Sequence, residues 1–282
     1  MSASAAELPH RACPACQAPP GAHVRLGAYS RSEWSIVRCE RCRLVFLANP
    51  PSYAELATEH EWRHAYRKER SRRREDRPAY YAVSDSIKRA RKALRRALGR
   101  GLRKDVAAII AAAPDGGRVL DVGCSNGPTL RQLPDRYTPF GVEISPILGA
   151  ESDVLCRARG GHVEICDALA GLERFGDATF TVVSMESYLE HETRPRDVLA
   201  QVRRVLAPGG KLVVKVPNFG SLNRRLRGAD WPGFRFPDHV SYFTPTTLRD
   251  AMLRAGLEID RFRLIDRLPT SDNMWLIARR PS

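Results

Sequence analysis

The sequence lacks any long apolar run. No stretch approaches the roughly 20 apolar residues that a membrane-spanning helix needs. The first ten residues, MSASAAELPH, also lack the basic start and apolar core of a secretory signal. Hydrophobic residues still make up 43% of the 282 residues, enough to bury a sizeable core. We therefore expect a cytoplasmic protein with no membrane span, built from one α/β domain and a small appendage.

Cysteine is scarce and unevenly spaced. Of the seven cysteines, Cys13 pairs with Cys16 and Cys39 with Cys42 in two CxxC motifs that are separated by 22 residues. The other three stand alone: Cys124, Cys156 and Cys166. An odd total with paired spacing favours a reducing compartment and a metal over a disulfide framework. Four thiolates can fill the coordination sphere of one Zn²⁺, so we predict a structural zinc site in a ribbon-like module over residues 1–52. Spare ligand candidates are His10 and His23.

Acidic residues are too few to balance the charge, and the excess lies in one segment. The net charge is +14, and residues 63–104 alone hold 17 Lys and Arg against 4 Asp and Glu. The run Asn49-Pro-Pro-Ser52 marks a boundary before this segment. We predict a basic helical linker or lid over residues 53–105. Three roles stay open for it: a solvated face over a pocket, a contact to a phosphorylated, nucleotide-linked or carrier-bound substrate, or nucleic-acid binding.

The pattern changes after Pro114, where short β-rich runs alternate with helical stretches. The runs lie at residues 118–123, 139–144, 162–166, 180–185 and 211–216, and the clearest helix is expected at 197–206. Strands that alternate with helices predict a parallel sheet with right-handed crossovers. Two further runs, at 257–265 and 274–279, predict an antiparallel hairpin at its edge. Residues 106–282 should thus form a doubly wound α/β domain with a mainly parallel seven-stranded sheet.

Acidic residues follow three successive strands of this predicted sheet. Asp121 precedes the turn Gly123-Cys-Ser-Asn-Gly127, Glu143 ends the second strand and Asp167 follows the third. The carboxyl ends of parallel strands meet at one edge, where such folds bind ligands, and an acid after the second strand commonly takes a ribose. Glycines let a backbone approach its ligand closely. The dinucleotide pattern GxGxxG is absent, so a nicotinamide cofactor is the weaker alternative.

These motifs resemble those of the class I S-adenosylmethionine-dependent methyltransferases. VLDVGCSNG is similar to their first motif, GVEIS to their ribose-binding segment, ICDAL to their adenine-side segment, and LAPGGKLVVKVPN to their fifth strand. The resemblance covers about residues 106–282 and departs from the family at Thr181, where an Asp often stands. It implies S-adenosylmethionine as cofactor and S-adenosylhomocysteine as product. The residues it assigns to the cofactor are Asp121, Gly123, Cys124, Gly127, Glu143, Asp167, Ala168 and Met185.

Two histidines follow strands at the same edge and are candidate general bases. His191 lies in YLEHETRP and His239 in a segment rich in aromatics. A hydroxyl acceptor must lose a proton, and histidine is the usual base near neutral pH. The structural alternatives are a helix-start role for His191 and a hydrogen-bonding role for His239. The nearby aromatics could wall an acceptor pocket or form plain core: Trp231, Phe234, Phe236, Tyr242 and Phe243.

The leading hypothesis is methylation of a hydroxyl on a sugar-like or secondary-metabolite acceptor, since the segment around His239 resembles enzymes of those pathways. The turn at 184–187 reads SMES, without the Pro-Pro-aromatic or Pro-Cys patterns used for amino groups or cytosine carbon. The zinc module also resembles that of sugar C-methyltransferases, although Arg43 stands where a glycine is usual. Three further hypotheses stay open: an RNA methyltransferase that binds nucleic acid through the ribbon and basic helix, a sugar C-methyltransferase, and a zinc-ribbon binding protein without activity.

Overall fold

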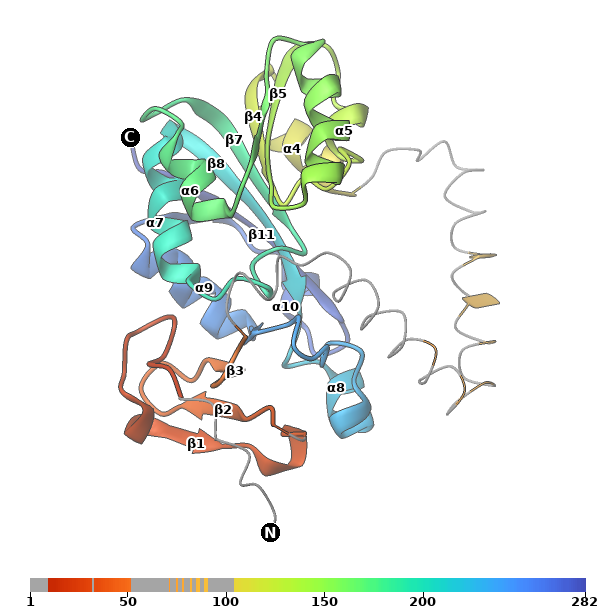
Figure 1. The fold of residues 1–282 in the computed structure, drawn as a ribbon, viewed down its shortest axis with the longest axis vertical. Coiled ribbons are helices and arrows are strands. Elements are labelled where there is room, and N and C mark those ends of the chain that lie inside the picture. The colour runs from red at the N-terminus through yellow and green to blue at the C-terminus, as the bar shows by residue number, and fades with distance from the viewer. Residues whose placement is uncertain are drawn as a thin grey trace.

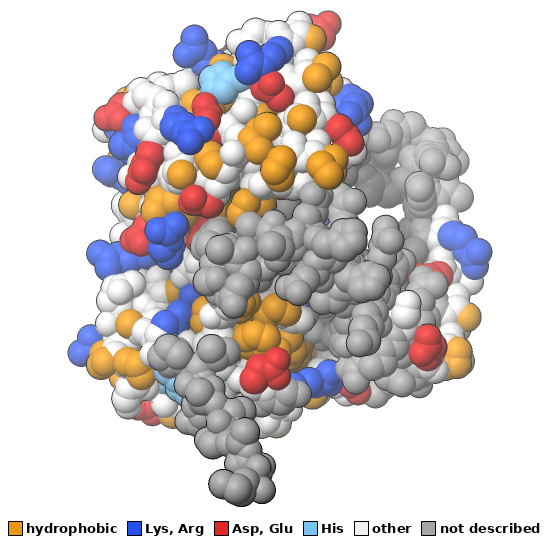
Figure 2. Space-filling view, in the orientation of Figure 1, with side chains coloured by type: hydrophobic (Ala, Val, Ile, Leu, Met, Phe, Trp, Pro, Cys, Tyr) orange, Lys and Arg blue, Asp and Glu red, His pale blue; other side chains and the backbone are white. Residues whose placement is uncertain are grey.

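A computed structural model describes residues 10–31, 33–51 and 104–282, together with eight isolated positions between residues 71 and 90. Figure 1 shows these parts as a small β-rich module near the N-terminus and a larger α/β part. On the face drawn in Figure 2, Lys and Arg side chains are interspersed with Asp and Glu, in agreement with the near balance of charge outside residues 63–104. The predicted basic linker, residues 53–105, lies almost wholly outside the described residues, so its role stays a prediction.

A seven-stranded sheet forms the centre of the α/β part. Its spatial order is β10-β11-β8-β7-β4-β5-β6, in which the five strands from β8 to β6 run parallel and the pairs β8–β11 and β11–β10 are antiparallel. This order confirms the predicted fold and its terminal hairpin. The strands are β4 Gly117–Val122, β5 Tyr137–Glu143, β6 Val163–Ile165, β7 Phe180–Glu186, β8 Leu206–Pro217, β10 Glu258–Arg261 and β11 Asn273–Arg279.

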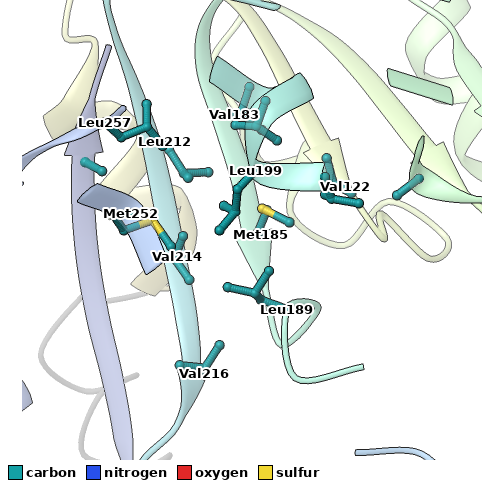
Figure 3. Close-up of a cluster of buried hydrophobic side chains, with 14 of the residues drawn as sticks. Val122, Val183, Met185, Leu189, Leu199, Leu212, Val214, Val216, Met252 and Leu257 are labelled. Carbon is teal, nitrogen blue, oxygen red and sulfur yellow. The ribbon is translucent and has the colours of Figure 1, made fainter. Parts of the chain in front are cut away.

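Helices cover both faces of this sheet. On one face Leu199 and Val202 of α7 pack with Met252 of α9 against β7 and β8, as Figure 3 shows in part. On the other face Val106 and Ile109 of α4 are buried with residues from β4. The helices are α4 Lys104–Ala112, α5 Pro146–Arg157, α6 Ala168–Glu173, α7 Pro195–Val205, α8 Leu222–Arg227, α9 Pro245–Arg254 and α10 Leu264–Arg267. Short 3₁₀ turns lie at Pro20–Ala22, Gly27–Tyr29, Leu130–Gln132 and Gly228–Asp230.

The helix predicted over 197–206 is α7, whose sequence explains its bounds. It starts with Pro195 at its first turn, where a missing amide costs nothing. Val198, Leu199, Val202 and Val205 then recur at helical spacing and are all buried, while the opposite face is polar. This single apolar stripe directs α7 onto the sheet and places the loop before it at the carboxyl edge of β7.

The N-terminal module forms a second sheet that the α/β part completes. Its order is β1-β2-β3-β9, all antiparallel, with β1 His23–Arg25, β2 Ile36–Cys39 and β3 Val45–Leu47. The fourth strand, β9 Ser241–Tyr242, comes from the segment after β8 and lies two residues beyond His239. The sequence boundary near residue 52 is therefore not a boundary in space, because strand pairing joins the two parts.

Arg11 strengthens this junction. Its guanidinium group donates hydrogen bonds to the carbonyl oxygens of Leu47 (3.1 Å), Thr193 (2.7 Å) and Val240 (3.3 Å). The three acceptors belong to the module, to the loop after β7 and to the segment leading into β9. Burial lowers the pKa of Arg11 to about 10, so the side chain stays charged at neutral pH. One buried cation thus ties three separate segments together.

Replacement of this cation should weaken the junction. We expect Arg11→Ala to lower the free energy of unfolding by about 3 kcal/mol, because charged hydrogen bonds are lost and carbonyl groups stay buried without partners. Urea denaturation followed by circular dichroism measures this change. Arg25→Ala, which removes an exposed arginine from β1, is the matched control and should change stability by less than about 0.5 kcal/mol. Equal effects of the two substitutions would refute the role of Arg11.

Candidate active site

A glycine turn follows β4 at the carboxyl edge of the sheet. Gly123 and Gly127 have φ angles of +76° and +75°, which glycine adopts without strain. The amide of Gly123 donates to the carbonyl of Val142 at 2.8 Å, which holds the turn against β5. A Cβ atom at position 123 would lie 2.7 Å from Cδ2 of Tyr188. The turn and the loop after β7 are therefore in close contact, and only glycine fits between them.

The carboxylate of Glu143 lies against this turn. Its Oε2 accepts a hydrogen bond from the amide of Ser125 at 2.8 Å, and its Oε1 accepts one from the amide of Ser145 at 2.9 Å. Each carboxylate oxygen can accept a second hydrogen bond, so the fixed side chain can still bind a pair of hydroxyl groups. Ile144, which follows, is 38% exposed and provides apolar surface beside it. This arrangement suits the ribose and base of an adenosine.

Asp167 lies at the end of the third strand and caps the next helix. Its Oδ1 accepts hydrogen bonds from the amides of Leu169 (3.1 Å) and Ala170 (3.2 Å) at the start of α6, where Ala168 is buried. Nη2 of Arg194, from the loop before α7, lies 3.6 Å from the same carboxylate. The ion pair connects the third strand end with the loop after β7. Sequence reasoning does not single out Arg194, because a lone arginine in a loop carries no pattern.

The structure restricts what three of the predicted cofactor residues can do. Asp121 is 4% exposed, and in the sheet it lies beside Gly141 of β5 and Ser184 of β7. The thiol of Cys124 contacts the hydroxyl of Ser152 at 3.4 Å, and burial raises its pKa. Met185 is fully buried in the core that Figure 3 shows. Because the side chains of Cys124 and Met185 pack inside the protein, their predicted cofactor contacts are limited to the backbone.

The loop after β7 has its own polar network. The hydroxyl of Tyr188 donates to Oε2 of Glu192 at 2.6 Å, and Oε1 of Glu192 accepts from the amide of Arg194 at 2.7 Å. Glu192 is 1% exposed, so these bonds fix the loop rigidly beside the glycine turn. The dense polar run YLEHETRP directly after a buried strand is the sequence signal that could have identified Tyr188 and Glu192.

The two histidines meet at this edge of the sheet. Their ring centroids are 4.6 Å apart and the rings are perpendicular, at 89°. Nδ1 of His191 lies 3.0 Å from the carbonyl oxygen of Asp238, and Nδ1 of His239 lies 2.8 Å from that of Gly233. A carbonyl only accepts, so both Nδ1 atoms carry the proton and each Nε2 keeps its lone pair. His191 lies in the turn before α7 and does not start that helix.

Burial keeps both histidines neutral. It lowers the pKa of His191 to about 3 and the pKa of His239 well below its usual value. His239 is 4% exposed, whereas His191 is only partly buried. His191 is therefore the more exposed member of the pair.

Glu190 completes this cluster. Its backbone carbonyl accepts hydrogen bonds from the amides of Val240 (2.8 Å) and Ser241 (3.0 Å), which attaches the start of β9 to the loop after β7. Its side chain is 2% exposed, and burial raises its pKa to about 7. Glu190, His191 and His239 offer donor atoms that all lie within 4.8 Å of one another.

The four module cysteines also come together. The Sγ atoms of Cys13 and Cys42 are 3.5 Å apart, those of Cys16 and Cys39 are 3.6 Å apart, and the cluster spans less than 4.8 Å. A tetrahedral Zn²⁺ with Zn–S bonds of about 2.3 Å spaces its sulfur ligands by about 3.8 Å. The four thiols therefore fit such an ion. The ring of His23 packs instead on Phe46, 5.0 Å between centroids, with Nε2 bonded to Ala18.

The aromatic residues near His239 are mostly buried in core. Trp231, Phe234 and Tyr242 are 1–3% exposed and pack with Ile36 and Leu47 of the module. Phe243 is buried in the main core. Phe236 is partly buried and stacks on Phe234 at the edge of the cluster shared with the module. Their burial favours the interpretation as plain core, and these side chains pack the module against the α/β part.

A cavity of about 570 Å³ opens beside the carboxyl ends of β7 and β8. Charged and polar side chains dominate its lining, with one aromatic ring. Two of its lining residues, Glu186 and Lys215, form an ion pair with an N–O distance of 3.9 Å. The remaining lining residues are Lys104, Asp105, Asp266, Thr270, Ser271, Asp272, Asn273 and Trp275.

Comparison with known proteins shows the family of the chain. Residues 91–261, more than half of the chain, match the family described as methyltransferase domain. The chain belongs to this family. Two solved S-adenosylmethionine-dependent methyltransferases share the fold of this methyltransferase, each with a TM-score of 0.50. The protein from Methanosarcina mazei is 19% identical, and the match covers 64% of this chain and 98% of that protein. The protein from Mesorhizobium loti is 18% identical, and the match covers 62% of this chain and 96% of that protein. This methyltransferase is thus of class I.

Curated relatives match shorter stretches. A tRNA (carboxymethyluridine(34)-5-O)-methyltransferase of Arabidopsis thaliana is 32% identical over 39% of this chain and 26% of its own. The O-methyltransferase cnsE of Penicillium expansum is 33% identical over a match that covers 42% of this chain and 44% of the relative. The ubiquinone/menaquinone biosynthesis C-methyltransferase of Stutzerimonas stutzeri is 30% identical over a match that covers 37% of this chain and 43% of the relative. The matches span less than half the length of these relatives. Within the described residues, no helix has the length and apolarity to cross a bilayer.

The cofactor assignment predicts a specific loss of binding. Glu143→Gln removes the negative charge beside the glycine turn and leaves the size of the side chain unchanged. We expect at least a tenfold weaker affinity for S-adenosylhomocysteine, about 1.4 kcal/mol, in a calorimetric titration. Glu151→Gln on the exposed face of α5 is the control and should bind as the wild type does. Unchanged affinity in Glu143→Gln would remove this residue from the cofactor site.

Proposed function

We propose that this methyltransferase transfers a methyl group to a hydroxyl of a small molecule, sugar-like or from secondary metabolism, with His191 as the general base. S-adenosylmethionine would supply the methyl group as a sulfonium. The observation that carries the proposal is the partly buried imidazole of His191, on the loop whose Tyr188 touches the glycine turn. A proton acceptor held there meets the requirement of a hydroxyl nucleophile.

The cofactor would lie across the ends of β4 to β7. Glu143 is oriented by two backbone amides and would accept the ribose hydroxyls. Asp167 and Ala168 would flank the adenine, with the apolar surface of Ile144 beside it. The backbone of the Gly123–Gly127 turn would face the methionine part. Fixed groups of this kind align the reacting atoms, which is the main contribution an enzyme makes to a direct displacement.

The tautomer of His191 supports its role as base. Its Nδ1–H donates to the carbonyl of Asp238, so Nε2 is the nitrogen that accepts a proton. Burial keeps the imidazole neutral before reaction, since its pKa lies at about 3, and the same burial makes it a weaker base. The carboxylate of Glu190, within 4.8 Å of the imidazole donor atoms, would stabilise the imidazolium as it forms. His239 would hold the ring of His191 in place by edge contact.

The polar cavity supports a polar acceptor. Its lining includes Glu186 and Lys215, from the carboxyl ends of β7 and β8, and has four carboxylates in all. The indole of Trp275 could stack on one face of a sugar-like ring. Two relatives methylate oxygen according to their names, cnsE and the tRNA enzyme, which favours oxygen over the carbon methylated by the Stutzerimonas enzyme.

A tRNA acceptor is the second candidate. The Arabidopsis relative carries tRNA in its name, and residues 63–104 hold a large excess of positive charge. The buried position of Trp231, Phe234 and Tyr242 speaks against stacking of bases on the module, because these rings pack inside the protein. The small-molecule acceptor is therefore our first choice.

We further propose that the four cysteines bind one structural Zn²⁺. Four thiolates leave no open position for substrate. Because β3 of the module pairs with β9, metal loss should disturb the histidine segment. We expect Cys39→Ser to lose the zinc found in the wild type by elemental analysis and to lose turnover, while S-adenosylhomocysteine still binds. Cys166→Ser, which changes a cysteine outside the cluster, should keep both metal and activity.

Substitution of the proposed base separates chemistry from cofactor binding. We expect His191→Ala to lower kcat at least about 100-fold, because the acceptor proton has no base, with S-adenosylhomocysteine affinity within twofold of the wild type. His162→Ala, a histidine packed on Phe140 away from the site, should retain full turnover. A His191→Ala enzyme with normal kcat would eliminate this residue as base.

Nucleic-acid binding distinguishes the two acceptor classes. If the acceptor is a small molecule, purified protein should carry no RNA and should show no tRNA affinity that falls steeply between about 50 and 200 mM salt, conditions under which phosphate contacts weaken strongly. Gel-shift titration at several salt concentrations measures this. Tight, salt-dependent tRNA binding together with methylation of tRNA would replace the small-molecule proposal.

A further inference from the structure

Two atoms of the histidine cluster are buried without a partner. Nε2 of His239 and Oε2 of Glu190 are shielded from solvent and make no hydrogen bond with any described residue. A buried lone pair without a partner costs free energy, typically about 1–3 kcal/mol. Native proteins rarely leave such atoms without a partner, so each calls for an explanation such as an ordered water, a catalytic role or an ion. The side chains that carry them, with that of His191, each offer a donor atom within 4.8 Å of the others.

The hydrogen bonds around the cluster resemble the support of a metal site. Each histidine donates its Nδ1–H to a backbone carbonyl, His191 to Asp238 and His239 to Gly233. Histidines that ligate metals are generally oriented in this way, with one nitrogen anchored and the other directed at the ion. Glu190 supplies a carboxylate at the same place. Two imidazoles and one carboxylate make a ligand set suited to Zn²⁺, Ni²⁺, Cu²⁺ or Fe²⁺.

Size and charge are compatible with an ion. The three donor atoms lie within 4.8 Å of one another. Donors about 2.1 Å from a tetrahedral ion are about 3.4 Å apart, a spacing that lies within this limit. The nearby cations are each paired: Arg235 with Asp238 at 2.5 Å and Lys215 with Glu186 at 3.9 Å. In its deprotonated form, the carboxylate of Glu190 gives the volume a favourable charge for a dication.

We propose that Glu190, His191 and His239 form a second metal site, which binds a divalent first-row transition metal and thereby inhibits methyl transfer. The ion and the acceptor proton would use the same nitrogen of His191, so they compete. The inhibition rests on the proposed role of His191 as base, whereas the binding does not. This site differs in kind from the cysteine cluster, since it has nitrogen and oxygen donors and an open side toward the partly exposed His191.

Cobalt(II) is a suitable probe because its absorption reports the ligands. Full-length protein with its cysteine cluster loaded with zinc is titrated with Co²⁺, and bound metal is counted after gel filtration. We expect one additional Co²⁺ per chain, with a visible ligand-field spectrum and without the intense near-ultraviolet bands of cobalt–thiolate bonds. His239→Ala should weaken this binding at least tenfold, and His162→Ala should leave it unchanged.

Glu190→Gln is a second variant that keeps the shape of the site, and it should also weaken cobalt binding. Thermal melting shows whether each variant is folded. No additional Co²⁺ in the wild type, or wild-type binding in folded Glu190→Gln and His239→Ala, would overturn the metal site. Added Zn²⁺ should lower wild-type turnover at least tenfold, reversibly on addition of citrate. Cobalt binding with undiminished turnover would overturn the inhibition and the assignment of His191 as base, and leave the metal site standing.

Discussion

The position of both histidines depends on one very short strand. Strand β9 has two residues, Ser241 and Tyr242, yet it pairs with β3 of the N-terminal module on one side. On the other side, the amides of Val240 and Ser241 donate to the carbonyl of Glu190 in the loop after β7. His239 lies just before this strand, and His191 directly follows Glu190. Without these backbone bonds the two rings would have no reason to meet, because they come from segments almost fifty residues apart.

Arg11 and the aromatic core stabilise the same junction from its two flanks. The guanidinium binds carbonyl groups of the module, the β7 loop and the β9 segment. Trp231 and Phe234 pack on Ile36 and Leu47 in a separate apolar cluster. The module is thereby part of the framework that holds the active-site edge, and the proposed Zn²⁺ on its four cysteines would stabilise that framework. A zinc-ribbon-like element therefore does not need a nucleic-acid ligand to explain its presence in this methyltransferase.

Local periodicity allowed much of the fold to be predicted. Apolar runs alternating with amphipathic stretches indicated the parallel sheet, and the acids after three strands indicated its binding edge; Glu143 does lie against the glycine turn. What no local pattern contained was the direction of single side chains and the pairing of distant segments. Met185 and Cys124 turn into the core, Trp231 and its neighbours form core, and Glu190 joins the histidines. These outcomes depend on tertiary packing, which overrides neighbours in sequence.

The β3–β9 pairing also constrains how the chain is made. Synthesis starts at the N-terminus, so β1, β2 and β3 leave the ribosome nearly two hundred residues before β9 does. During that interval the edge of β3 has no strand beside it, and Ile36 and Leu47 lack the rings that later cover them. Pairings between such distant segments form slowly, and exposed strand edges invite aggregation. Metal capture by the early-made cysteines would give the nascent module a stable shape while it waits for its last strand.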